Sequence, residues 1–113
     1  MPPKNNPLKL NPLQLRTLTL FQALARIPGA GQERPGGEVA ILQIPDAHGD
    51  HFHLGDAVVA GKDATGLTNE AVWNALTRKG LARAEYPREM ILTAEGVAYD
   101  TGEANAILQK SGH

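Results

Sequence analysis

The histidines and carboxylates of one short stretch are the most conspicuous reactive side chains in the sequence. They are Asp46, His48, Asp50, His51 and His53. Imidazole and carboxylate groups are suitable ligands for zinc or nickel, so the stretch has the chemistry of a metal site. No rigid support for a complete ligand set can be identified, and we therefore predict a solvated hairpin tip without a bound metal. A pH-responsive surface is the other interpretation, because imidazole changes its charge near physiological pH.

Basic side chains form a second group farther along the chain. This group sets Arg78, Lys79, Arg83 and Arg88 against Glu85 and Glu89. Residues 38–63 are acidic by contrast, so an anionic partner would meet the basic region. Lysine and arginine contact phosphate in nucleic-acid complexes. Charged residues near a helix end are also often merely solvated, and basic ones suit the helix dipole.

The composition is that of one small globular domain. The chain has 113 residues, of which 42% are hydrophobic and 20% charged, and its formal net charge is −1. A dedicated nucleic-acid binder usually carries a basic excess, so this balance argues against strong DNA binding. The absence of cysteine excludes disulfides, thiolate metal sites and thiol catalysis. No nucleophile with a base, paired carboxylates or phosphate loop can be assembled, so we predict no enzyme and no cofactor.

The ends of the chain and its hydropathy indicate the extent of the domain. Residues 1–7 are polar and rich in proline, which predicts a disordered arm. We place a single domain at residues 8–108 and a flexible tail at residues 109–113. No segment approaches the roughly 18 apolar residues of a membrane span, and no signal peptide is recognisable. We therefore expect a cytoplasmic protein that makes no membrane contact.

The first helix is predicted from its cap and its apolar spacing. Asn11 is a suitable N-cap, Pro12 fits the first helical position, and the helix should end near Ile27. Its apolar stripe consists of Leu13, Leu15, Leu18, Leu20, Phe21, Leu24 and Ala25. We expect this stripe to pack in the core. An interface in a homodimer is the second interpretation, because a chain of this size buries a limited share of its own surface.

The middle of the chain predicts a loop and a β-hairpin. Glycine and proline at high density disfavour both helix and strand over residues 28–37. Residues 38–44 and 51–54 are expected to pair as the two strands of a hairpin. A short helix over residues 55–61 and a turn over residues 62–66 should follow.

Alternation along the second of these strands predicts which side chains face the core. Phe52 and Leu54 should point inward, and His51 and His53 should point into solvent.

A second helix is predicted over residues 68–79. Thr68 is the expected N-cap, and Gly80 provides the stop signal. Trp73 lies at the edge of the apolar stripe of this helix. We expect it to pack in the core or an interface rather than to stack on a base.

A second hairpin and two short segments complete the chain. Extended pieces around Pro87 form the hairpin over residues 83–90. Thr93 is expected to cap a short helix, and a last amphipathic piece covers residues 104–108.

The C-terminal half resembles winged-helix transcription regulators of the MarR and PadR kind. The shared pattern is Leu76, Lys79-Gly80-Leu81, Arg83 and then Leu92-Thr93-x-Glu95-Gly96. The resemblance implies a small, mostly helical α+β domain of the winged-helix type. An extra β-hairpin would lie between its first two helices, and the C-terminal hairpin would be the wing.

The same resemblance implies double-stranded DNA as a partner. The second helix would enter the major groove, and the wing over residues 83–90 would lie near the backbone. The implied contact residues are Thr68, Asn74, Thr77, Arg78, Lys79, Arg83 and Arg88. Glu70 would repel phosphates unless it accepts a hydrogen bond from a cytosine amine. The alternative is a winged-helix module that binds another protein through its acidic hairpin or its leucine face, without DNA binding.

Overall fold

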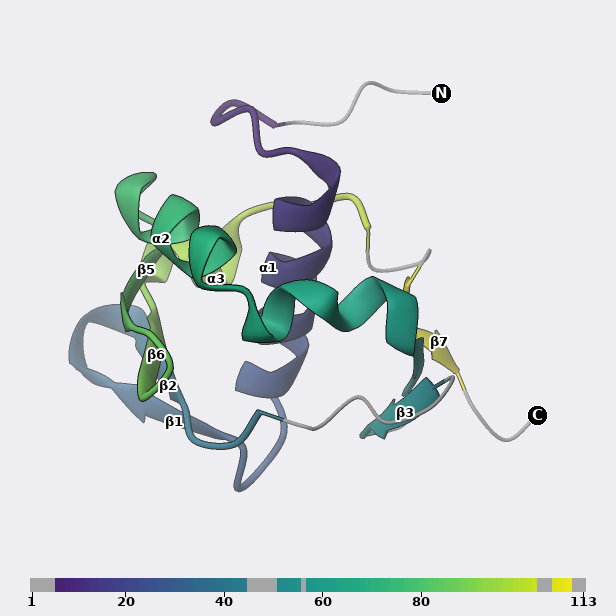
Figure 1. The fold of residues 1–113 in the computed structure, drawn as a ribbon. Coiled ribbons are helices and arrows are strands. Elements are labelled where there is room, and N and C mark those ends of the chain that lie inside the picture. Colours follow the sequence, from purple (N-terminus) through teal and green to yellow (C-terminus); the bar gives the residue numbers. More distant parts are fainter. Residues whose placement is uncertain (1–5, 45–50, 56, 104–106, 111–113) are drawn as a thin grey trace.

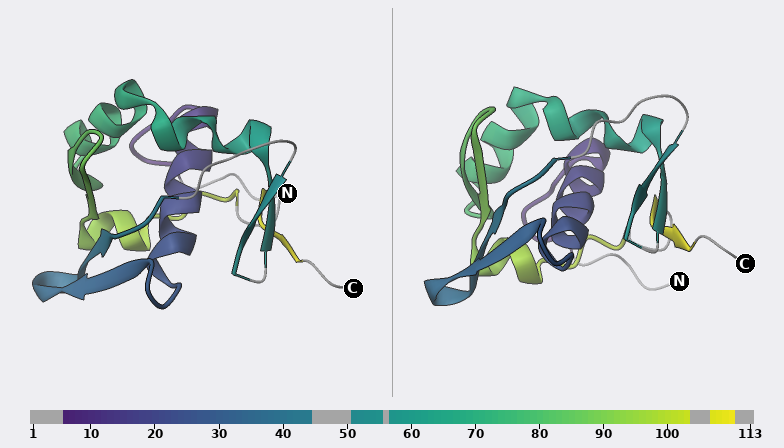
Figure 2. Two further views of the ribbon diagram at one scale, coloured as in Figure 1. Left: turned by 60° about the horizontal axis from the view of Figure 1, so that its bottom comes forward. Right: turned by 90° about the horizontal axis from the view of Figure 1, so that it is seen from below.

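A computed structural model describes residues 6–44, 51–55, 57–103 and 107–110 (Figure 1). Their elements run in the order α1 (Pro12–Ala25), β1 (Gly31–Arg34), η1 (Pro35–Gly37), β2 (Glu38–Ile41), β3 (His51–Leu54), β4 (Ala57–Ala60), η2 (Gly61–Thr68), α2 (Glu70–Arg78), β5 (Ala82–Glu85), β6 (Glu89–Leu92), α3 (Ala94–Ala98) and β7 (Gln109–Lys110). The helix α1 lies between a four-stranded and a three-stranded sheet (Figure 2). The α+β class expected from the sequence is therefore present. The described part of the domain is not mostly helical as expected, because it has seven strands, and two hairpins rather than one lie between α1 and α2.

The predicted first helix is confirmed together with its cap. The side chain of Asn11 accepts a hydrogen bond from the Gln14 backbone at 2.8 Å, and the Gln14 side chain accepts one from the Asn11 backbone at 3.0 Å. This reciprocal pair satisfies backbone donors that the first turn leaves free. The leucines of the stripe that are buried within the chain are Leu15, Leu18, Leu20 and Leu24. Core packing of this leucine face is thus confirmed.

The four-stranded antiparallel sheet has the order β1-β2-β6-β5. The predicted second hairpin is confirmed as β5 and β6, with Ala82 opposite Leu92. On its other side β6 pairs with β2, where Val39 lies opposite Leu92 and Ile41 opposite Met90. Ile41, Ala82, Met90 and Leu92 belong to the buried hydrophobic cluster, so this face of the sheet closes the core.

The predicted pairing of residues 38–44 with residues 51–54 is wrong. Residues 38–44 do not pair with residues 51–54, because β2 pairs with β1 and β3 pairs with β4. The region predicted as a loop supplies β1. The chain reverses at Gly36 and Gly37, whose φ angles of 82° and 81° favour glycine. A density of glycine and proline does not distinguish a tight hairpin turn from an irregular loop.

The three-stranded sheet has the order β3-β4-β7. The short helix predicted over residues 55–61 is wrong, because Ala57–Ala60 forms β4, where the β-branched Val58 and Val59 favour the extended backbone. At the end of the described chain, Gln109–Lys110 pairs with β4 where a flexible tail was expected.

The segment before α2 is a 3-10 helix that packs closely on α1. A Cβ atom added to Gly66 would lie 1.8 Å from the Oγ1 atom of Thr17, so only glycine fits there. The predicted second helix is confirmed as α2, but its N-cap is Asn69 rather than Thr68. The Asn69 side chain accepts hydrogen bonds from the backbone of Ala71 and Val72, whereas Thr68 is the last residue of η2.

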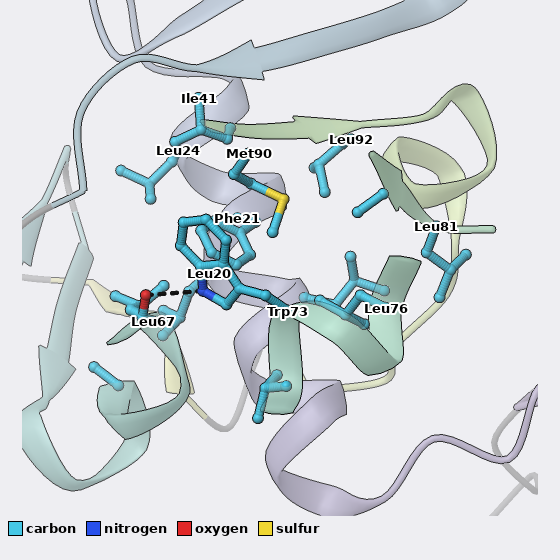
Figure 3. Packing of buried hydrophobic residues seen from close by; sticks show 14 of the residues in the cluster. Leu20, Phe21, Leu24, Ile41, Leu67, Trp73, Leu76, Leu81, Met90 and Leu92 are labelled. Carbon is cyan, nitrogen blue, oxygen red and sulfur yellow. Dashed lines mark hydrogen bonds between the residues drawn. The ribbon is translucent and has the colours of Figure 1, made fainter. Parts of the chain in front are cut away.

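Trp73 lies at the centre of the core (Figure 3). It is 1% exposed, and its indole nitrogen donates a hydrogen bond to the Leu67 carbonyl oxygen at 3.0 Å. Its ring meets Phe21 and Tyr86 edge to face, with centroid distances of 5.8 Å and 4.8 Å. Core packing of the tryptophan is therefore confirmed, and its polar group is satisfied.

Thr93 caps α3 as predicted. Its hydroxyl accepts a hydrogen bond from the Gly96 backbone at 3.1 Å and donates one to the Gly80 carbonyl oxygen at 2.7 Å. Within the described ranges no helix is both long and apolar enough to cross a bilayer. The expectations for residues 1–5, 45–50, 104–106 and 111–113 lie outside the described residues.

Candidate functional site

Polar side chains line the exposed face of α2. The buried face carries Val72, Trp73, Ala75 and Leu76, which hold the helix against the core. Because residues three and four apart share a helix face, the opposite side presents a solvent-exposed set that we call the α2 row. It consists of Glu70, Asn74, Thr77 and Arg78.

The β5–β6 hairpin lies against α2. The Tyr86 hydroxyl donates a hydrogen bond to the Thr68 carbonyl oxygen at 2.7 Å, and the Tyr86 ring contacts Trp73. Arg88 follows in the turn and is 82% exposed; its nearest carboxylate is Glu85 at 3.9 Å. Ion pairs this exposed contribute little, so the Arg88 charge is available to a partner.

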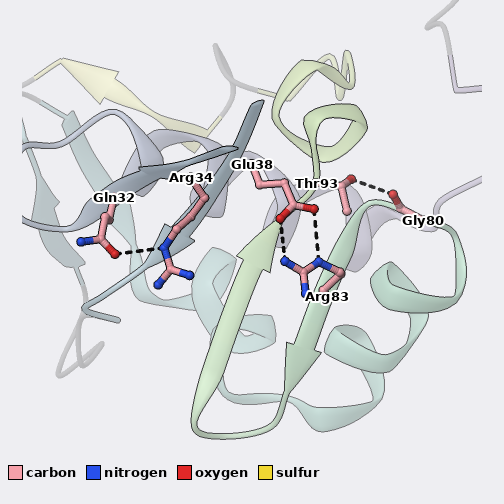
Figure 4. A network of polar contacts seen from close by, with 6 residues as sticks. All are labelled: Gln32, Arg34, Glu38, Gly80, Arg83 and Thr93. Atoms are coloured by element: carbon pink, nitrogen blue, oxygen red, sulfur yellow. Dashed lines mark hydrogen bonds and ion pairs between the residues drawn. The ribbon is translucent and has the colours of Figure 1, made fainter. Parts of the chain in front are cut away.

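Arg83 differs from Arg88 because it has a strong internal partner. Its guanidinium donates two hydrogen bonds to the carboxylate of Glu38, at 3.1 Å and 2.6 Å (Figure 4). These hydrogen bonds and the opposite charge lower the pKa of Glu38 and raise the pKa of Arg83. Much of the charge predicted for a phosphate contact is therefore compensated within the sheet.

Lys79 also has an internal partner. Its ammonium group donates a hydrogen bond to the backbone carbonyl oxygen of Leu8 at 2.8 Å. Two of the four predicted cations, Lys79 and Arg83, are thus engaged within the chain. The structure brings Asn74, Thr77 and Arg78 together on one face.

An apolar groove lies at the C-terminal end of α2. Its volume is about 780 Å³, and its lining residues are Pro7, Leu8, Lys79, Gly80, Leu81, Glu95, Ala98, Tyr99 and Asp100. The Tyr99 hydroxyl donates to Asn6 and accepts from the Leu8 backbone, which holds the N-terminal segment over α3. Sequence reasoning missed this groove because its walls come from three segments that lie far apart in the sequence. The only local signal was Leu8 after a prolyl residue.

The histidines of β3 lie on the side of α1 that faces away from the β5–β6 hairpin (Figure 2). His51 and His53 are both exposed, as predicted, and Leu54 is buried; the side chain of Phe52 is not described. The two imidazole rings have a centroid distance of 5.5 Å. Asp46, His48 and Asp50 lie outside the described residues. Among the residues that are described, no group of three or more histidine, cysteine or acidic side chains is arranged to hold a metal ion.

No family model matches the sequence, and no curated protein or solved structure shows a significant match to it. The function therefore has to be inferred from the geometry of the chain itself.

Proposed function

We propose that the chain is a winged-helix domain that binds duplex DNA through the α2 row and the β5–β6 hairpin. The observation that carries the proposal is the exposed set Asn74, Thr77 and Arg78 on α2, beside a hairpin whose Tyr86 ring contacts Trp73 of the same helix. The element order adds support. The short helix η2, the helix α2 and the β5–β6 hairpin follow one another directly, and β6 pairs with the earlier strand β2.

The proposed contacts divide into two kinds. Asn74 and Arg78 carry donors and acceptors that suit base edges in a major groove, and the Thr77 hydroxyl suits a phosphate. Arg88 would meet the backbone from the hairpin turn, where it positions the protein without reading sequence. The negative charge of Glu70, at the start of α2, repels phosphate. The proposed DNA contact is therefore limited to the C-terminal part of the α2 row.

The charge balance predicts weak binding that depends on salt. Arg83 and Lys79 are engaged internally, so Arg78 and Arg88 supply the cations of this surface. Because each phosphate contact releases condensed counterions, a small number of contacts gives a shallow dependence of affinity on salt. We therefore expect weak binding to mixed-sequence duplex that is measurable at low salt and falls only about tenfold between roughly 50 mM and 200 mM salt.

Fluorescence anisotropy with a labelled mixed-sequence duplex tests this function. Arg88→Gln should weaken binding and reduce the slope of log affinity against log salt by about 0.9, because Arg88 is the proposed phosphate contact. Arg26→Gln removes the same charge from the exposed C-terminal end of α1 and should leave the slope unchanged. No binding by the wild-type chain at low salt, or equal losses in both variants, would reject the proposal.

The apolar groove supports a second candidate function, the docking of another protein without DNA. Its lining is largely apolar, and Glu95 and Asp100 lie at its margin. A partner segment with apolar side chains and a basic residue would complement both properties. Absence of DNA binding at low salt would favour this candidate.

A further inference from the structure

His51 and His53 form an exposed pair at the edge of the three-stranded sheet. They are separated by one residue on β3, so both side chains leave the strand on the same face. Their ring centroids are 5.5 Å apart, and the ring planes meet at 80°. The pair lies apart from α2 and its hairpin, on the other side of α1 (Figure 2).

The separation of the rings matches that of two imidazoles that share one metal ion. With zinc–nitrogen bonds of about 2.0–2.1 Å and tetrahedral angles, the centroids of two coordinated imidazoles lie about 5 Å apart. The observed distance is close to this value, so small rotations about the side-chain bonds would bring one nitrogen of each ring to a common ion.

We propose that His51 and His53 together bind one divalent transition-metal ion of the zinc class. Imidazole nitrogen suits zinc, nickel and copper, whereas magnesium prefers oxygen ligands. With two protein ligands and water in the other positions, the ion remains open to a further donor.

Isothermal titration calorimetry of the full chain with zinc chloride at neutral pH tests the pair. The wild-type chain should bind one equivalent of zinc and give no comparable signal with magnesium. His51→Gln and His53→Gln should each weaken binding at least about tenfold, since residues that only orient a metal ligand already change affinity that much. His113→Gln removes an imidazole from the end of the sequence and should bind as the wild type does.

Three results would overturn the proposal. They are no zinc binding by the wild-type chain, unchanged affinity in either pair variant, and an equal loss in His113→Gln. Because both side chains are exposed, the substitutions should preserve the fold, and circular dichroism checks this directly. Nitrogen NMR spectra of the wild-type imidazoles provide a second measurement. The NMR signal of one ring nitrogen of His51 and of one ring nitrogen of His53 should shift when zinc is added. Shifts confined to other histidines would also overturn the proposal.

Discussion

Arg83 on β5 and Glu38 on β2 join across the intervening strand β6 through two hydrogen bonds, at 3.1 Å and 2.6 Å. Strand register places Arg83 opposite Ile91, which in turn lies opposite Ala40, so the pair lies on the sheet face that Ile91 occupies. This ion pair links the hairpin to the body of the sheet. It also removes a positive charge from the surface that we propose for DNA.

The pair predicts an unusual titration of Glu38. Its pKa is lowered chiefly by the hydrogen bonds from Arg83, so the folded carboxylate stays charged at lower pH than an ordinary glutamate. The resulting stabilisation is fully present above the pKa of the unfolded chain and is lost as pH falls through the lower, folded pKa. Carbon NMR of the carboxylates should show a titration midpoint for Glu38 below that of an ordinary glutamate. In Arg83→Gln this midpoint should return toward the ordinary range. An ordinary midpoint for Glu38 in the wild-type chain would contradict the pairing.

Releasing Arg83 should strengthen DNA binding. In Glu38→Gln the guanidinium loses its charged partner and becomes available to phosphate, which should tighten binding and steepen the salt slope by about one. Glu33→Gln is the matched control, because it removes the same charge from an exposed position on β1. Anisotropy titrations compare the two variants. If both variants tighten binding equally, net charge rather than the release of Arg83 is responsible.

The contact between Gly66 and Thr17 should limit substitution at η2. An added Cβ would overlap the Thr17 hydroxyl, and overpacking of this kind costs about 1–3 kcal/mol of folding free energy. Gly66→Ala should therefore lower the denaturation midpoint. The double variant with Thr17→Ala removes the overlapping oxygen and should recover part of the loss, which a double-mutant cycle measures. Strict additivity of the two substitutions would show that the contact is not the cause.

The hydrogen bond from Tyr86 to the Thr68 carbonyl oxygen should hold the hairpin against the end of η2, next to the start of α2. Its loss in Tyr86→Phe should cost about 1 kcal/mol and increase amide hydrogen exchange in β5 and β6. Tyr99→Phe is the comparison, since it removes hydroxyl contacts to the N-terminal segment instead. Exchange in the hairpin that rises equally in both variants would argue against a specific role for Tyr86.

Elements with strong local signals were predictable from the sequence. Asn11 and Pro12 begin α1, Gly80 follows α2, and Thr93 caps α3, each through contacts within a few residues. The pairing of β2 was not predictable in this way. Its partner strands β1 and β6 are chosen by the shared core, and the turn at Gly36 looks like an ordinary loop in the sequence.

The candidate site shows the same division. Helical spacing alone placed Asn74, Thr77 and Arg78 on one exposed face of α2. The engagement of Arg83 by Glu38 and of Lys79 by Leu8 could not be foreseen, because the partners are 45 and 71 residues away in the sequence. Such long-range contacts decide which cations remain available.

Amide NMR spectra recorded while a mixed-sequence duplex is added at low salt test most directly whether the α2 row binds DNA. The predicted result is a set of progressive shifts that reverse when salt is added and that cluster at Asn74, Thr77, Arg78 and Arg88. Amides that line the groove around Leu8 and Tyr99 should stay unchanged. Shifts confined to the groove, or no shifts at any duplex concentration, would contradict the proposed DNA surface.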